Sequence, residues 1–111
     1  MEDKNNATQQ LVFNLLKTRK AMAELRVKLA DIEFRYEEEK NDLLNYCDKI
    51  EECFLDLDNN AEGAKDPEFF AHNVHLIKAF LSGFTNRLKS VQNETAQRIY
   101  NFYFNATGLN N

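Results

Sequence analysis

The sequence is poor in the residues that interrupt helices. It holds three glycines, one proline and no tryptophan in 111 residues. An all-β domain needs turn-forming residues about every 8–12 positions, so this scarcity argues against such a fold. No apolar run approaches the roughly 18–20 residues of a membrane span, and the polar start Met-Glu-Asp-Lys-Asn-Asn does not look like a signal peptide. We therefore expect one helical, cytoplasmic domain with no membrane segment.

Cysteine is equally scarce. Cys47 and Cys53 are six residues apart, which on one helix separates them by about 9 Å along the axis. That separation is too long for a disulfide within the helix. We expect two reduced thiols, with a bridge across a symmetric dimer as the alternative.

What the sequence does contain is an apolar stripe with a seven-residue rhythm. Its steps alternate between four and three residues, a mean of 3.5, which keeps one seam of a helix facing a partner and indicates a left-handed coiled coil. The first stripe is Leu11, Leu15, Thr18, Met22, Leu25, Leu29, Ile32, Tyr36, Glu39, Leu43, Tyr46, Ile50, Cys53 and Leu57. The second is Phe70, Val74, Ile77, Leu81, Phe84, Leu88, Val91, Thr95, Arg98 and Phe102.

These stripes predict a single helical hairpin over residues 7–107, between flexible ends at 1–6 and 108–111. The first helix should run over about 7–58, with Asn6 as its N-cap, and a polar turn should follow over about 59–66. Asp66-Pro67-Glu68 is typical of a helix start, and the second helix should run over about 67–107. Gly83, in its middle, either costs about 1 kcal/mol relative to alanine or permits a neighbour to approach closely.

A lone hairpin cannot bury all the apolar residues of this chain. Several large ones fall outside the seam: Phe13, Val27, Phe34, Leu44, Cys47, Phe54, Phe69, Leu76 and Phe80. Exposed apolar surface of that size usually marks a partner. The predicted fold is therefore all-α, a long antiparallel hairpin that completes a four-helix bundle by dimerisation, with another helical protein as the alternative partner. The expected dimer seam is Leu25, Ile32, Leu43, Ile50, Ile77, Leu81, Phe84 and Leu88.

The function predicted from this pattern is non-enzymatic protein binding, as an adaptor, a chaperone-like protein or an inhibitor. The expected docking surface lies at the open end of the hairpin, where apolar helical residues from both chain ends would meet. It comprises Leu11, Phe13, Leu15, Leu16, Phe102, Tyr103 and Phe104, with Lys17, Arg19 and Lys20 as a charged rim.

Charge is segregated along the chain and leaves a second hypothesis open. Residues 31–62 carry twelve acidic and three basic side chains, a net charge of −9, whereas residues 1–30 carry six basic and three acidic ones, net +3. The acidic stretch could mimic nucleic acid and block an enzyme that binds DNA or RNA. Binding of nucleic acid by the chain itself is disfavoured, because the pI is about 5.2.

Catalytic and metal-binding patterns are weak. Ser82 and Ser90 lie in no Gly-x-Ser-x-Gly elbow, and no glycine-rich phosphate loop is present. His72 and His75 share a helix face with Glu68, but a metal site needs three or four converging ligands. We expect no enzyme activity, no cofactor and no metal.

The order of long helix, acidic turn and Asp-Pro-Glu restart resembles the helical hairpin of GrpE-type nucleotide-exchange factors. Leu43-Leu44, Asp48, Ile50-Glu51 and Asp66-Pro67-Glu68 carry the likeness. The exchange activity of that family relies on a β-domain, which this sequence does not predict. The size is also similar to that of small helical proteins that accompany type VII secretion substrates, but their Trp-x-Gly turn is missing. A secretion-system or virion accessory role is therefore a third hypothesis.

Overall fold

The computed structural model describes the backbone of residues 2–60 and 66–107, and the side chains of 9–60 and 66–104. Within these ranges the chain forms four helices and no strand: α1 (Glu2–Asp31), α2 (Glu37–Asn59), α4 (Pro67–Val91) and α5 (Glu94–Thr107). The predicted all-α class is confirmed.

Each of the two expected long helices is broken once. The first does not run unbroken over 7–58, because α1 ends at Asp31 and α2 begins at Glu37. The second is interrupted at residues 92–93, between α4 and α5. Helix α1 also begins at Glu2, so residues 2–6 are helical rather than loose. The expectation for residues 108–111 falls outside the described residues.

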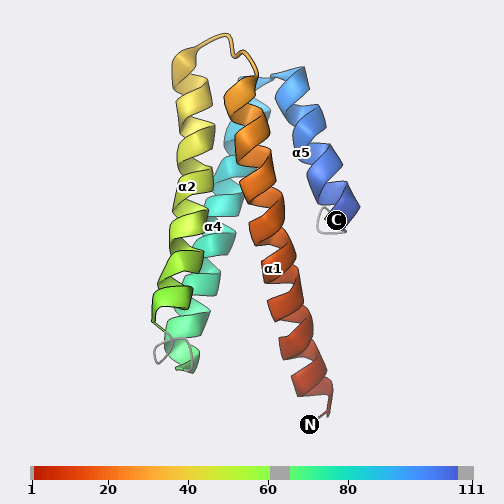
Figure 1. Ribbon diagram of the computed structural model, residues 1–111, viewed down its shortest axis with the longest axis vertical. Coiled ribbons are helices and arrows are strands. Elements are labelled where there is room, and N and C mark those ends of the chain that lie inside the picture. The colour runs from red at the N-terminus through yellow and green to blue at the C-terminus, as the bar shows by residue number, and fades with distance from the viewer. Residues whose placement is uncertain (1, 61–65, 108–111) are drawn as a thin grey trace.

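The four helices run alternately up and down and occupy four corners of a bundle (Figure 1). Helix α1 packs against α2 and α5, and α4 also packs against α2 and α5. Helices α1 and α4 therefore face each other across the diagonal. The chain measures 49 × 25 × 20 Å along its principal axes, much shorter than the roughly 78 Å that an uninterrupted helix over 7–58 would span.

The first break lies between Lys28 near the end of α1 and an acidic first turn of α2. Lys28 is in the last turn of α1, and three glutamates fill the first turn of α2. Cations at a helix C-terminus and anions at an N-terminus are stabilised by the helix dipole. The ammonium of Lys40 also donates to the carbonyl oxygen of Ile32 at 3.3 Å, which satisfies a carbonyl just beyond the end of α1.

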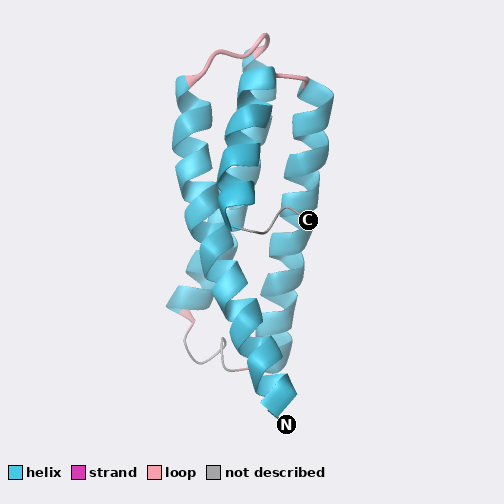
Figure 2. Cartoon of the chain, turned by 90° about the vertical axis from the view of Figure 1, so that its right-hand side faces the viewer, coloured by secondary structure: helices cyan, strands magenta, loops and turns pink. Residues whose placement is uncertain are grey.

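The second break is made by Gln92 and Asn93. Gln92 has the left-handed conformation, with φ 56° and ψ 38°. The Asn93 side-chain oxygen accepts from the backbone N–H of Ala96 at 3.0 Å, as an N-cap of α5, and its amide nitrogen donates to the carbonyl oxygen of Glu33 at 3.1 Å. The two breaks thus meet at the same end of the bundle (Figure 2).

Helix α4 starts as the sequence predicts. The Asp66 side chain accepts from the backbone N–H of Glu68 at 2.9 Å, and Pro67 occupies the first helical position. Of the predicted turn, Asn59 belongs to α2 and residues 61–65 lie outside the described part of the chain.

All four helices contribute to one core. The residues expected to form a dimer seam lie in it: Leu25, Leu43, Ile50, Ile77, Phe84 and Leu88 are buried, and Ile32 and Leu81 are half-buried against them. A second copy is therefore not needed to bury this seam. The two breaks fold each long helix back on itself, and most of the surplus apolar surface, such as Cys47 and Phe54, is covered within one chain.

Gly83 allows α2 and α4 to approach closely. A Cβ atom at this position would lie 2.6 Å from Cε1 of Tyr46 and 2.9 Å from its Cζ. The alternative raised from the sequence, that this glycine makes room for a neighbour, is confirmed.

Candidate functional site: a vacant corner of the bundle

Helix α5 is too short to fill its corner of the bundle. It has 14 residues, eleven fewer than the 25 of α4, so it falls short of α4 by about 17 Å. Figure 1 shows α5 ending about halfway along α1. Beyond the end of α5, among the described residues, α1 and α4 flank an open groove, which we call the vacant corner.

The vacant corner is a groove of about 450 Å³ with an apolar floor and polar edges. Its walls are Leu11, Asn14, Leu15 and Thr18 of α1 and Ile77, Lys78, Leu81, Ser82 and Thr85 of α4, and Tyr100 and Phe104 of α5 close its upper end. A groove with this form and lining is typical of sites that bind an amphipathic helix.

The two threonine hydroxyls in the vacant corner are already hydrogen-bonded to their own helices. The Thr18 hydroxyl donates to the carbonyl oxygen of Asn14 at 2.8 Å, and the Thr85 hydroxyl donates to that of Ser82 at 2.9 Å. These threonines can therefore turn their methyl groups to a ligand. Lys78 is the one charged residue among those that line the groove.

The outer face of α1 beside the vacant corner is apolar as well. Val12, Phe13 and Leu16 are 40%, 52% and 57% exposed, and the ammonium of Lys17 lies 4.3 Å from the centroid of the Phe13 ring. Over residues 11–16, α1 thus presents apolar side chains both into the groove and away from it.

The structure brings together part of the docking surface expected from the sequence. Leu11, Leu15 and Phe104 meet in the vacant corner. Phe104, however, is 3% exposed and stacks on Tyr100 with ring centroids 4.6 Å apart, so it is a core residue whose edge closes the groove.

The other expected contacts are distributed elsewhere. Phe102 is 68% exposed, and with Tyr103 it lines a separate shallow pocket of about 260 Å³ that includes Lys28 of α1. Lys20 lines a third hollow, between α1 and α2. The expected surface is therefore not one continuous site.

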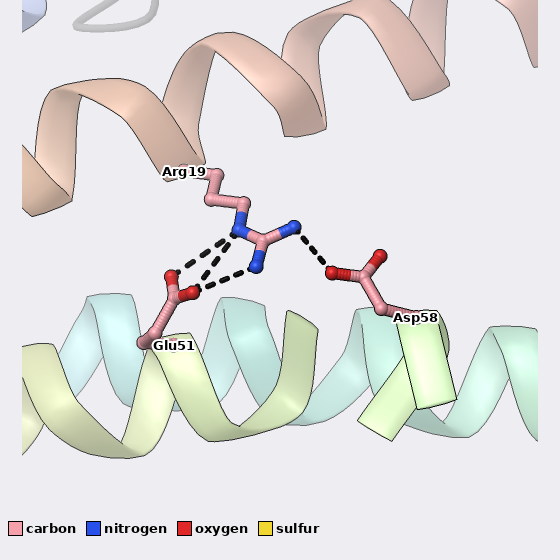
Figure 3. Close-up of polar contacts among 3 residues, drawn as sticks. All are labelled: Arg19, Glu51 and Asp58. Carbon is pink, nitrogen blue, oxygen red and sulfur yellow. Dashed lines mark hydrogen bonds and ion pairs between the residues drawn. The ribbon is translucent and has the colours of Figure 1, made fainter. Parts of the chain in front are cut away.

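Arg19 is not a free rim charge. Its guanidinium bridges two carboxylates of α2, with Nη2 2.7 Å from Oε1 of Glu51 and Nη1 2.8 Å from Oδ2 of Asp58 (Figure 3). The hydrogen bonds that Arg19 donates to Glu51, and to a smaller extent to Asp58, raise the pKa of Arg19 above its usual value. Its role is to hold α1 against α2.

Other acidic residues of α2 are paired in the same way. Asp48 accepts two hydrogen bonds from Arg26 of α1, and Asp42 accepts from Nε of Arg87 in α4 at 2.9 Å. Four of the nine acidic residues of α2 are thus paired with arginines of the same chain.

Sequence reasoning missed the polar and aromatic part of the lining, such as Lys78, Ser82 and Tyr100. These residues share a groove only because α5 turns back at Gln92 and Asn93 and is shorter than α4, beside which it runs. The available signal was Asn93 followed by Glu94, a favourable N-cap with an acid at the next position, within a stripe that otherwise continues without a slip.

The cysteines and the histidines lie in different surroundings. Burial raises the pKa of the Cys47 thiol to about 12 and also raises that of Cys53, so both thiols are protonated at neutral pH. His72 and His75 are exposed. Among the described side chains, those of 9–60 and 66–104, no three His, Cys, Asp or Glu residues are placed to share a metal ion.

None of the helices in the described ranges has both the length and the apolar character that crossing a membrane requires. Comparison of the chain with protein-family models, with curated proteins and with solved structures gives no match.

Proposed function

We propose that the chain is a non-enzymatic, cytoplasmic protein-binding module, and that its ligand is an amphipathic α-helix of a partner protein bound in the vacant corner. The observation that carries this proposal is the difference in length between α5 and α4. The upper half of the corner is filled by α5, and in the lower half α1 and α4 form the walls of a groove with no helix between them among the described residues.

The shape of the groove limits what can fill it. The missing length of eleven residues corresponds to about 17 Å, or three turns of helix. A helix that continues the line of α5 would lie antiparallel to α1 and α4, as α5 itself does. Its apolar side chains at i, i+4 and i+7 would contact Leu15 and Leu81.

Charge gives the ligand helix a preferred sequence. Lys78 lies on the edge of the groove and is not among the ion-paired residues of α4. A carboxylate on the edge of the incoming helix would pair with it. We therefore expect ligand helices with an apolar stripe and an Asp or Glu beside it.

The test is a selection from a displayed library of 14-residue helical peptides against the purified chain. The expected peptides carry the apolar spacing and the flanking acid. Binding should weaken about 30-fold or more in Ser82→Trp, in which the new ring fills the groove, because loss of a central contact costs about 2 kcal/mol or more.

The matched control is Asn86→Trp. Ser82 and Asn86 are both exposed on α4, but only Ser82 lines the groove. Selected peptides that bind both variants equally, or a selection that enriches no apolar stripe, would refute the proposal.

The second hypothesis, mimicry of nucleic acid by the acidic stretch, receives no support from the geometry. A mimic needs free carboxylates in a regular array, and this array is interrupted at Asp42, Asp48, Glu51 and Asp58, which are paired with arginines of the same chain.

A further inference from the structure

We infer that two copies of this chain can exchange α5. In the exchanged dimer, Gln92 and Asn93 become helical, α4 and α5 join into one helix, and each α5 occupies the upper corner of the other copy's bundle. The occupant of the corner is thus a second copy of this chain. This inference concerns the upper half of the corner and does not depend on the proposed function.

The first support is the strained connection between α4 and α5. Only two residues separate the helices, and Gln92 is the one non-glycine residue with positive φ in the described part of the chain. The left-handed conformation is unfavourable for an L-residue that has a side chain. Short strained hinges favour exchange, because straightening them relieves the strain.

The second support is that the sequence around the hinge suits an uninterrupted helix. It contains neither glycine nor proline over residues 84–107, and the stripe of α4 continues in register through Thr95, Arg98 and Phe102. In the closed chain these three residues are exposed, Phe102 to 68%. Thr95, Arg98 and Phe102 continue the apolar stripe of α4 in sequence, but the turn at Gln92 directs them into solvent.

The third support is that exchange preserves the core. The buried face of α5 comprises Ala96, Tyr100 and Phe104, and the Tyr100 ring lies 5.9 Å from that of Phe84 in α4. In the exchanged dimer the same rings meet, but across two chains. The balance between the two forms is then set by the hinge and by protein concentration.

Asn93 holds the closed form. Its side chain caps α5 through Ala96 and binds the carbonyl oxygen of Glu33 in the connection between α1 and α2. The cap is lost when residue 93 becomes helical. Asn93→Ala should therefore increase the proportion of dimer.

The decisive pair of variants is Gln92→Gly and Gln92→Ala, compared by light scattering over a series of concentrations. Glycine favours the left-handed turn and weakens a helix, whereas alanine does the reverse. Since the dimer contains two hinges, the dimerisation constant should be about 1,000-fold higher for Gln92→Ala than for Gln92→Gly. Equal constants, or a Gln92→Ala chain that stays monomeric at millimolar concentration, would overturn the inference.

A second measurement identifies which helix is exchanged. In a dimer assembled from isotope-labelled and unlabelled copies of Gln92→Ala, filtered nuclear Overhauser spectra should show a contact between Phe84 and Tyr100 across the two chains. The contact between Tyr100 and Phe104, which are both in α5, should stay within one chain. If the contact between Phe84 and Tyr100 also stays within one chain, the dimer is not formed by exchange.

The variant Ser82→Trp distinguishes exchange of α5 from binding of a ligand helix. Ser82→Trp fills the lower half of the corner and leaves the hinge unchanged. It should weaken peptide binding about 30-fold or more and leave the dimerisation constant within about twofold of the parent chain, an energy difference below 0.5 kcal/mol.

Discussion

Single side chains decide how closely the helices pack, and Tyr46 with Gly83 is the clearest case. A Cβ at position 83 would overlap the Tyr46 ring, with its nearest atom at 2.6 Å. Gly83→Ala should therefore destabilise the chain by about 1–3 kcal/mol, the usual cost of overpacking, even though alanine is the better helix former. Urea unfolding measures the difference.

The control for this prediction removes the ring. In a Tyr46→Ala chain, Gly83→Ala should instead stabilise by up to about 1 kcal/mol, because only the helix propensity remains. The sign of the effect should reverse between the two backgrounds. The same sign in both would mean that the ring moves aside without cost.

Cys47 makes the stability of the chain sensitive to alkaline pH. Burial raises its pKa from 9.0 to about 12 in the folded chain. Between these values the unfolded chain releases a proton that the folded chain retains, so the free energy of unfolding falls as pH rises, by up to about 1.4 kcal/mol per pH unit for one group. Burial also raises the pKa of Tyr100, which adds to the loss at higher pH.

Thermal unfolding between pH 8 and 10 tests this coupling. Cys47→Ala removes the thiol, so its stability should fall less steeply with pH over this interval than that of the parent chain. Because the substitution also alters the core, slopes are compared rather than absolute values. Parallel curves would show that the Cys47 thiol does not contribute.

At the scale of helices, Arg19 is the main polar link between α1 and α2. It bridges Glu51 and Asp58 with its side chain 26% exposed, whereas Arg98 on α5 is 82% exposed and 4.0 Å from Glu94. Arg19→Met should cost about 1 kcal/mol, near the upper end for exposed ion pairs. Part of that loss should disappear in 1 M salt, where screening shortens the Debye length to about 3 Å.

Arg98→Met is the matched control and should change the free energy of unfolding by less than about 0.5 kcal/mol. Equal losses for the two variants would contradict the special role of Arg19. A loss at Arg19 that does not respond to salt would indicate packing on Phe54, whose ring centroid lies 5.4 Å away, rather than charge.

The sequence predicts the helices better than their ends. The heptad stripe correctly predicts an all-helical chain, and Asp66-Pro67 correctly starts α4, but Ile32 and Tyr36 of the stripe lie between α1 and α2 rather than in a helix. The breaks at 32–36 and 92–93 were missed because no glycine or proline marks them. They arise from tertiary burial: an unbroken hairpin leaves Cys47 and Phe54 in water, and folding back buries both.

At the scale of the whole molecule, the two architectures differ in size. The folded-back chain has a radius of gyration of 15.1 Å for its Cα atoms and a longest axis of 49 Å. Small-angle X-ray scattering of the dilute chain should give a radius close to this value. A hairpin with an unbroken helix over 7–58 would be about 78 Å long, and a maximum dimension of that order would refute the folded-back form.

The candidate site is the part of the molecule that the sequence predicts least. Leu11 and Leu15 were expected in a docking surface and do line the vacant corner. Their neighbours across the groove come from α4, which a simple hairpin would have placed beside α1 and α2 with no fourth corner at all. The groove exists because α5 turns back at Gln92 and Asn93 and is shorter than α4. The position of that turn is set by packing between helices, and the apolar stripe of the sequence does not mark it.

The position of the two breaks determines at which end of the bundle the helices can separate. Both lie at one end of the bundle, linked through Asn93 and Glu33, while the early part of α1 projects beyond the opposite end (Figure 1). The hydrogen bond from Asn93 to Glu33 opposes separation of the helices at that end. The groove between α1 and α4 should therefore widen most at the other end, around Leu11. Amide protons there should exchange with solvent fastest, and a ligand could enter without disturbing the stacked rings of Tyr100 and Phe104.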